Sequence, residues 1–238
     1  MRSKAPRRAV MAALLSAVLA GCAPLLRVPA PAPAAPPADF PEAYYREALA
    51  QGKLVFRVDP AESLVVIEVR RAGSLARLGH DHVVASHELG GYVAPDEGRA
   101  DLYVALARMQ VDEPALRKQA GFDTQPTESD IEGTRSNMLE KVLEAEKFPF
   151  ALIRVSGAKA KEKKTTLNFA ITLHGHLRTL EVPAEIDADA EKMSVTGRLS
   201  FDQTDFGITP YSLLGGAIAV QNRIDLRFRI IARLPGAG

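Results

Sequence analysis

Apolar and polar residues alternate along most of the chain from about Leu54 onward, which is the pattern of half-buried β-strands. The alternation is clearest in residues 220–230, where most even positions are apolar and all odd positions are polar or charged. Eight further segments alternate more loosely or form short apolar runs: residues 54–58, 63–71, 87–93, 99–108, 150–156, 165–174, 177–186 and 193–201. The chain therefore predicts eight or nine strands, many with one dry face and one wet face.

One segment has a helical period instead. Residues 129–147 carry apolar side chains at spacings of three and four: Ile131, Met138, Leu139, Val142 and Leu143. Ser129 and Glu132 predict a capping box at its start, and Phe148-Pro149 ends it. A short second helix is predicted over residues 41–51, with Pro41 at its start and Gly52 after its end. Gly90-Gly91 and Gly215-Gly216 predict turns or bulges rather than a phosphate-binding loop.

These elements predict an all-β fold of antiparallel strands with one inserted α-helix. The strand pattern fits either a sandwich or a closed barrel, and closure leaves no strand edge unpaired. A barrel of about eight strands has an interior that is filled by its own side chains or that holds one small ligand.

The first residues predict an export signal. Four basic residues precede an apolar stretch over residues 9–20, which is too short to span a bilayer. The stretch ends in the sequence LAGC at residues 19–22, and Cys22 is the only cysteine in the chain. This end resembles the lipobox of bacterial lipoproteins, which implies cleavage before Cys22 and lipidation of Cys22. The alternative is an ordinary secretion signal with an incidental cysteine.

Cleavage there gives three segments: a signal peptide at residues 1–21, a lipidated N-terminus with a stalk and short helix at 22–51, and a β-domain at 52–234. The stalk is the run of Ala and Pro in residues 23–41, which favours either an extended polyproline chain or a disordered tail. No second cysteine is present, so a disulfide framework is excluded. Loss of residues 1–21 removes four basic residues and changes the formal net charge from +1 to −3. A mildly acidic chain without a basic block gives no electrostatic basis for binding nucleic acid.

The sequence carries no enzyme signature. It lacks a Gly-x-Ser-x-Gly nucleophile elbow, and lipidation would use its one cysteine. Four of its five histidines form two pairs, His80 with His82 and His174 with His176. Residues two apart on a strand project from one face, so adjacent pairs could bind zinc, copper or nickel. The other interpretation places His174 in a turn before Gly175 and residues 79–82 in a loop held by a hydrogen bond of Asp81, and it is the one we favour.

Four motifs occur in order along the β-domain: LVFRVDP at residues 54–60, FP at 148–149, LHGHLR at 173–178 and FDQTDFGI at 201–208, followed by Pro210. Together they resemble the YceI-like family over residues 54–232. The resemblance implies a lipocalin-like antiparallel barrel with an apolar tunnel. It also implies a polyisoprenoid ligand, such as an isoprenoid quinone tail, and a place in the envelope of Gram-negative bacteria.

The expected function is therefore non-enzymatic binding of a long apolar ligand by an envelope lipoprotein, with no cofactor other than a bound isoprenoid lipid or quinone. Its expected partners are that lipid and a membrane, reached through the acyl chains. Ala23 after the cysteine favours sorting to the outer membrane, facing the periplasm. Strand alternation names the ligand-binding side chains: Leu102, Val104, Leu106, Leu167, Phe169, Ile171, Ile224, Leu226 and Phe228. The alternative function is metal binding by His80, His82, His174 and His176.

Overall fold

The computed structural model of the protein describes residues 34–157 and 163–236. Its helices are α1 (Glu42–Ala50), α2 (Pro114–Ala120) and α3 (Glu128–Asn137), with a π-helix over Met138–Val142 directly after α3. Its strands are β1 (Phe56–Val58), β2 (Leu64–Val69), β3 (Arg71–Ala72), β4 (His82–Ser86), β5 (Leu89–Ala94), β6 (Arg99–Ala105), β7 (Gln110–Val111), β8 (Phe150–Ser156), β9 (Lys164–Leu173), β10 (His176–Ala188), β11 (Lys192–Asp202), β12 (Ser212–Leu213), β13 (Ile218–Val220) and β14 (Arg223–Arg233). The predicted signal peptide and Cys22 lie outside the described residues.

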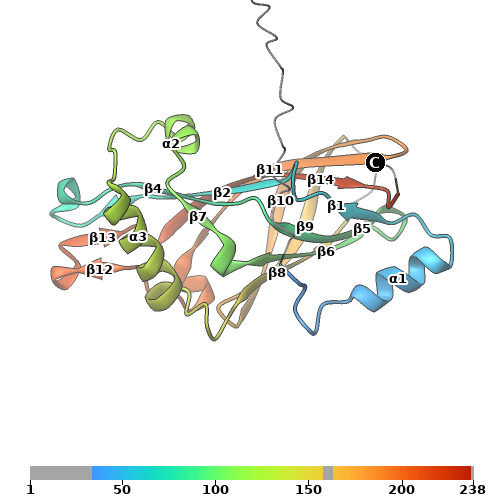
Figure 1. The fold of residues 1–238 in the computed structure, drawn as a ribbon, viewed down its shortest axis with the longest axis horizontal. Coiled ribbons are helices and arrows are strands. Elements are labelled where there is room, and N and C mark those ends of the chain that lie inside the picture. The colour runs from blue at the N-terminus through green and yellow to red at the C-terminus, as the bar shows by residue number, and fades with distance from the viewer. Residues whose placement is uncertain (1–33, 158–162, 237–238) are drawn as a thin grey trace, which may run out of the picture. The chain divides into compact units, whose positions relative to one another are not determined.

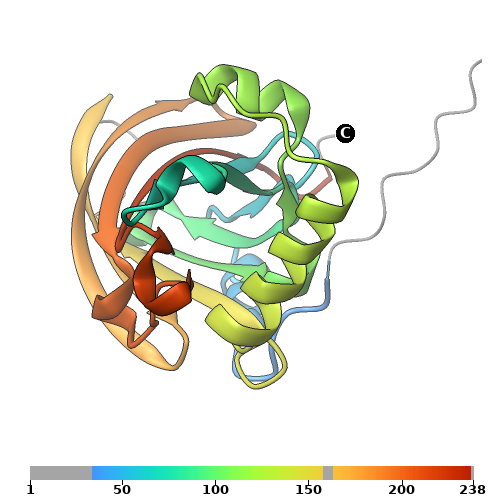
Figure 2. The same ribbon diagram turned by 90° about the vertical axis from the view of Figure 1, so that its left-hand side faces the viewer.

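Eight strands close into an antiparallel barrel (Figure 1). The order around it is β1-β5-β6-β8-β9-β10-β11-β14, and β14 pairs with β1 to complete the ring. Figure 2 looks into one end of this barrel, with α3 lying across it. The predicted antiparallel β-barrel of about eight strands is confirmed.

Three of the barrel strands are interrupted and continue on the other side of the break. β1 and β2 both pair with β14, and residues 59–63 separate them. This break contains Pro60, which has no N–H to donate to a ladder. On one side of the break the strand order is β1-β5-β6, and on the other side it is β2-β4-β7. β4 therefore continues the line of β5, and β7 continues the line of β6. These continuations lengthen one wall of the barrel at the end opposite α1 (Figure 1).

The inserted helix is shorter than predicted, and a second helix precedes it. The helical segment is α3 plus one π-turn, and its capping box joins Thr127 and Asp130, not Ser129 and Glu132. Its apolar residues, including Met138 and Leu143, pack against the barrel core as their spacing predicts. The prediction of a single inserted helix missed α2, which has only seven residues. Pro114 at the start of α2 and left-handed Gly121 after its end are ordinary signals of where a helix begins and ends.

The strand boundaries also needed corrections. The predicted strand over residues 220–230 is divided, because β13 ends at Val220 and joins a small separate sheet with β3 and β12. β4 was missed. Gly90-Gly91 lies inside β5 rather than in a turn: the Tyr103 ring covers Gly90, and a Cβ on Gly91 would come within 2.3 Å of the Asp101 carbonyl oxygen. Gly215 and Gly216 form the predicted turn, both with positive φ.

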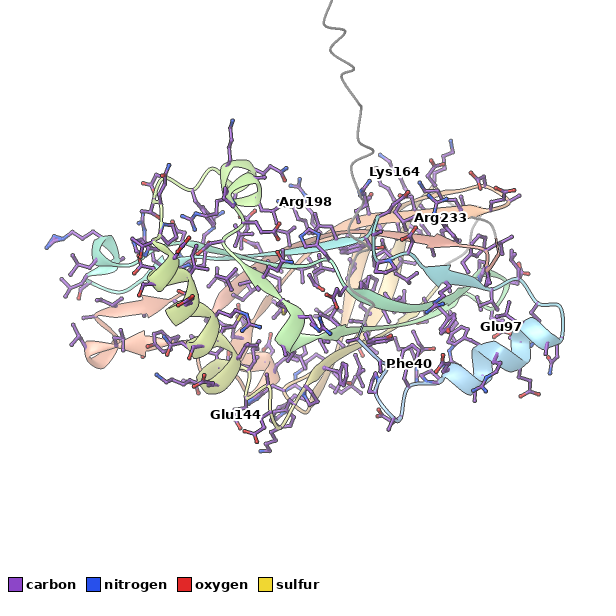
Figure 3. All side chains as sticks on the ribbon, viewed as in Figure 1. Phe40, Glu97, Glu144, Lys164, Arg198 and Arg233 are labelled. Atoms are coloured by element: carbon purple, nitrogen blue, oxygen red, sulfur yellow. The ribbon has the colours of Figure 1, made fainter. Side chains whose placement is uncertain are left out.

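The half of the barrel next to α1 is filled by side chains. Phe56, Leu167, Val182 and Met193 are at most 1% exposed there. Outside this half, α1 docks through buried Tyr45, whose hydroxyl donates to Asp101 at 2.7 Å. Lys53 after the helix pairs with Glu97 at 2.9 Å, at the end of the barrel where Figure 3 labels Glu97. The filled core leaves no open interior at this end, and α1 packs beside it in a separate cluster of Tyr45, Ala48, Val55 and Ala94.

The segment before α1 also contacts the barrel. The Phe40 ring lies edge-on to Tyr103 with centroids 4.9 Å apart, and the Tyr103 hydroxyl donates to the Ala34 carbonyl. The predicted stalk therefore ends earlier than Pro41, since residues 34–40 lie against the barrel wall. The domain boundary at residue 52 stays a prediction. None of the helices in the described residues is long and apolar enough to cross a membrane.

Candidate ligand cavity

A cavity of about 550 Å³ occupies the other half of the barrel. Most residues of its wall are apolar, and strands β2, β4, β6, β8, β9, β11 and β14 all contribute to it. Its volume is in the range of roughly 300–1,000 Å³ that is typical of sites for one small ligand. The barrel is therefore closed and filled at the α1 end and hollow toward the α3 end.

The structure places eight of the nine predicted side chains on the cavity wall. They are Leu102, Val104, Leu106, Phe169, Ile171, Ile224, Leu226 and Phe228. Leu167 also points inward, but it is 1% exposed and belongs to the filled half. The role of these residues in ligand binding stays a prediction.

Two phenyl rings form the boundary between the hollow and filled halves. The centroids of Phe169 and Phe228 lie 5.6 Å apart, and both rings are almost fully buried. Phe228 lies over Gly197 on the paired strand β11, where a Cβ would come within 2.6 Å of the ring. The glycine thus makes the room for the ring that forms the cavity floor.

Other wall segments could not be found by strand alternation. The π-turn contributes Met138 and Val142, and the small sheet contributes Leu213 and Ile218. Leu213 is 47% exposed, so the cavity reaches the surface at this end. A period-two pattern contains no information about loops and helices that fold over a barrel end.

The polar part of the cavity wall is centred on His82. The His82 Nδ1 atom lies 2.6 Å from the Asp112 carboxylate, which also accepts from the Val83 N–H at 3.0 Å and from Arg117 at 2.5 Å. Burial alone would raise the pKa of the Asp112 carboxyl, but these hydrogen bonds outweigh it and hold the pKa below its usual value. Asp112 is therefore ionised, and Nδ1 of His82 carries the proton that it donates.

His80, Arg71, Ser129 and Asp130 also belong to the polar part of the wall. Its other polar residues are Ser86, Thr134, Asn137, Gln203 and Tyr211. The His80 and His82 rings are perpendicular with centroids 6.0 Å apart. Hydrogen bonds from the Thr127 hydroxyl and N–H lower the pKa of Asp130, and the two histidines act in the same direction. Asp81 accepts from the Arg71 N–H at 2.8 Å, so residues 79–81 form the expected loop held by this aspartate. The predicted loop over residues 79–82 is one residue too long, because His82 begins β4 and pairs with Val69.

The second histidine pair lies in a different environment. His174 and Gly175, both with positive φ, form the two-residue turn between β9 and β10, as the turn interpretation predicted. His174 contacts Glu144 at 3.2 Å, and His176 lies against Gly207. Figure 3 shows Glu144 at the lower edge of the barrel, below α3. In the part of the chain that the structure describes, no three His, Cys, Asp or Glu side chains group closely enough to hold a metal ion.

Fold and cavity define the chain as a ligand-binding β-barrel protein. A family model described as the YceI-like domain matches residues 56–232, so the chain belongs to the YceI-like family. No curated protein matches the sequence.

Two solved structures share the fold. One is a polyisoprenoid-binding domain from Saccharophagus degradans implicated in plant cell wall breakdown, with a TM-score of 0.56 and 14% identity over 77% of this chain and 100% of that domain. The other is BcnA from Burkholderia cenocepacia, with a TM-score of 0.50 and 16% identity over 73% of this chain and 98% of BcnA. At these identities the likeness establishes the barrel architecture.

Proposed function

We propose that the protein is a non-enzymatic carrier that holds one long apolar chain, such as a polyisoprenoid, inside its barrel. The apolar cavity with its phenyl floor is the observation that carries this proposal. Burial of a prenyl chain releases about 0.8 kcal/mol for each methylene-sized group. Roughly 20 such groups give about 16 kcal/mol, which exceeds the association cost of about 4–15 kcal/mol. The polyisoprenoid-binding domain of the same fold supports the choice of ligand class.

We further propose that acyl chains on Cys22 anchor this carrier in the envelope of a Gram-negative bacterium, at the outer membrane and facing the periplasm. The lipobox at residues 19–22 supports this location. Several acyl chains on one residue give firm attachment, whereas a single chain is marginal. Residues 23–33 would then connect the anchor to the barrel.

The carrier proposal is tested by organic extraction of the purified protein and mass spectrometry of the extract. We expect a long-chain lipid at near one equivalent. An extract without lipid, from a protein that also takes up no prenyl probe, would refute the carrier. Elemental analysis of the same sample tests the metal alternative, which predicts stoichiometric metal that is lost on His80→Ala with His82→Ala.

The anchor is tested separately by palmitate labelling and membrane fractionation. The wild type should be labelled and membrane-bound, and Cys22→Ser should be unlabelled. A soluble, unlabelled wild type would contradict the anchor while leaving the carrier proposal intact.

A further inference from the structure

The cavity contains a hydrogen-bonding group whose orientation is fixed. His82 projects into the cavity wall, among apolar residues such as Val84 and Ile67. Its Nδ1 is committed to Asp112, and in residues 34–157 and 163–236 no hydrogen bond is made by its Nε2. His82 is part of the cavity wall and its side chain is 13% exposed. A ligand that displaced water from Nε2 without supplying a hydrogen-bond partner would bind at a cost, so Nε2 is suited to a polar ligand group.

Asp112 determines which kind of ligand group Nε2 can take. Its side chain is fully buried and accepts from three donors, so it holds a proton on the Nδ1 atom of His82. In a neutral imidazole with Nδ1 protonated, Nε2 is an acceptor. The backbone of Asp112 has a φ of +58°, a conformation that non-glycine residues adopt rarely. This backbone is held by the Asp112 N–H donating to the Val83 carbonyl and by the carboxylate accepting from the Val83 N–H.

The charges around His82 disfavour an anionic ligand. The Arg117 guanidinium donates hydrogen bonds to the Asp112 carboxylate, the Asp81 carbonyl and Thr124. Arg71 is occupied by Asp81, Asp123 and the Gly79 carbonyl. Asp130 adds a carboxylate on the same part of the wall, where it has no cationic hydrogen-bond partner among the described residues. An uncharged donor therefore fits this end of the cavity better than a phosphate.

We infer that His82, oriented by Asp112, binds the hydroxyl group of a prenyl alcohol or prenylated phenol by accepting its O–H hydrogen bond at Nε2. The inference rests on the proposed carrier function and specifies the headgroup of its ligand. The inference predicts that the protein binds lipids with a hydroxyl headgroup more tightly than the corresponding ethers, quinones and phosphates. These have the same tail but no neutral hydroxyl group. His82 is the binding residue, and Asp112 is a positioning residue.

The test is a competition assay against a fluorescent prenyl probe with geranylgeraniol, geranylgeranyl methyl ether and geranylgeranyl phosphate. These share one tail, so their relative affinities report the headgroup alone. The processed wild-type protein should bind the alcohol about tenfold more tightly than the ether, and the phosphate no better than the ether. His82→Phe should bind alcohol and ether equally, with the ether affinity close to that of wild type.

His87→Phe is the matched control. His87 also pairs with a carboxylate, Glu113 at 2.8 Å, but it is half-exposed and lies outside the cavity wall. This variant should keep the tenfold preference for the alcohol.

The possible failures are distinguishable. Equal affinity of the wild type for alcohol and ether, a preference for the phosphate, or an intact preference in His82→Phe would overturn the headgroup assignment while leaving the carrier standing. A wild type that binds none of the three would overturn the carrier and the headgroup assignment together. The wild-type series needs no variant, so it decides even where His82→Phe does not fold.

Discussion

Replacing Leu226 with aspartate would place a carboxylate on the cavity wall, in the first half of β14. Its two cross-strand neighbours, Leu199 and Ile67, also line the cavity, so the new charge would have apolar neighbours on both sides. Leu226 itself is partly exposed, unlike Phe169 and Phe228. Water in an empty barrel can therefore hydrate the aspartate, and the folding penalty is smaller than at either phenylalanine.

A bound prenyl chain would remove that water. Desolvation of an unpaired carboxylate costs several kcal/mol in real proteins. Since about 1.4 kcal/mol corresponds to a factor of ten, affinity for the chain should fall by at least about 100-fold. The loss arises only when ligand is present, so binding should suffer more than stability.

The measurements are probe titration and urea unfolding of the same preparation. Arg229→Asp is the control, because Arg229 is exposed on the opposite face of β14. It should retain wild-type affinity. If Leu226→Asp unfolds cooperatively and still binds the probe as wild type does, the hollow half of the barrel is not the binding site. Equal losses in both variants would show a general effect of charge.

Three further predictions concern stability and ligand transfer. Burial alone would raise the pKa of the Asp101 carboxyl, but hydrogen bonds from Arg154, Arg99 and Tyr45 outweigh burial and lower this pKa. The ionised carboxylate therefore stabilises the fold fully above the unfolded pKa of about 3.9, and this stabilisation is lost as pH falls through the lower folded pKa. Asp101→Asn should lower the free energy of unfolding, measured in urea at pH 7, by about 1–3 kcal/mol. If the difference in unfolding free energy between wild type and variant does not become smaller toward pH 3, the ionised carboxylate is not the source of the stabilisation. Gly175→Ala should lower the unfolding free energy by about 1–2 kcal/mol, because Gly175 has a φ of +76° and a Cβ there would lie 2.8 Å from Phe148. Gly133→Ala is the contrast: a Cβ on Gly133 would meet open space, so this change should stabilise α3 by about 0.5–1 kcal/mol. Leu214→Ser, at a 73% exposed residue beside the open end, should slow prenyl transfer to vesicles severalfold, whereas Leu49→Ser on α1 should not; equal rates would exclude this end as the exit.

Strand alternation identified the barrel because its physical cause is local. One-sided burial of β9 and β14 produces the period of two directly in the sequence, and the two faces of β14 are as predicted. β4 was missed because four of its five residues are buried, so it does not alternate. α2 was missed because seven residues are too few to establish a helical period.

The cavity wall was predictable only in part, for a related reason. Leu167 and Phe169 point the same way from β9, and alternation cannot distinguish them. Leu167 lies in the half where the interior is filled, and Phe169 lies where the interior becomes hollow. That difference depends on side chains of strands distant in the sequence, such as Val182 opposite Leu167 and Phe228 against Phe169.

The polar end of the cavity depends even more on long-range packing. Sequence spacing groups His82 with His80, His174 and His176 as possible metal ligands, but the partner of His82 is Asp112, thirty residues away. Asp112 directly follows β7, in a left-handed conformation that turns its carboxylate toward β4, and the next helix supplies Arg117. A neutral histidine whose Nδ1–H donates to a buried carboxylate offers Nε2 to a ligand as an acceptor. The same residue type that suggested a metal site therefore acts, in this arrangement, as an acceptor for an uncharged hydroxyl group in an apolar cavity.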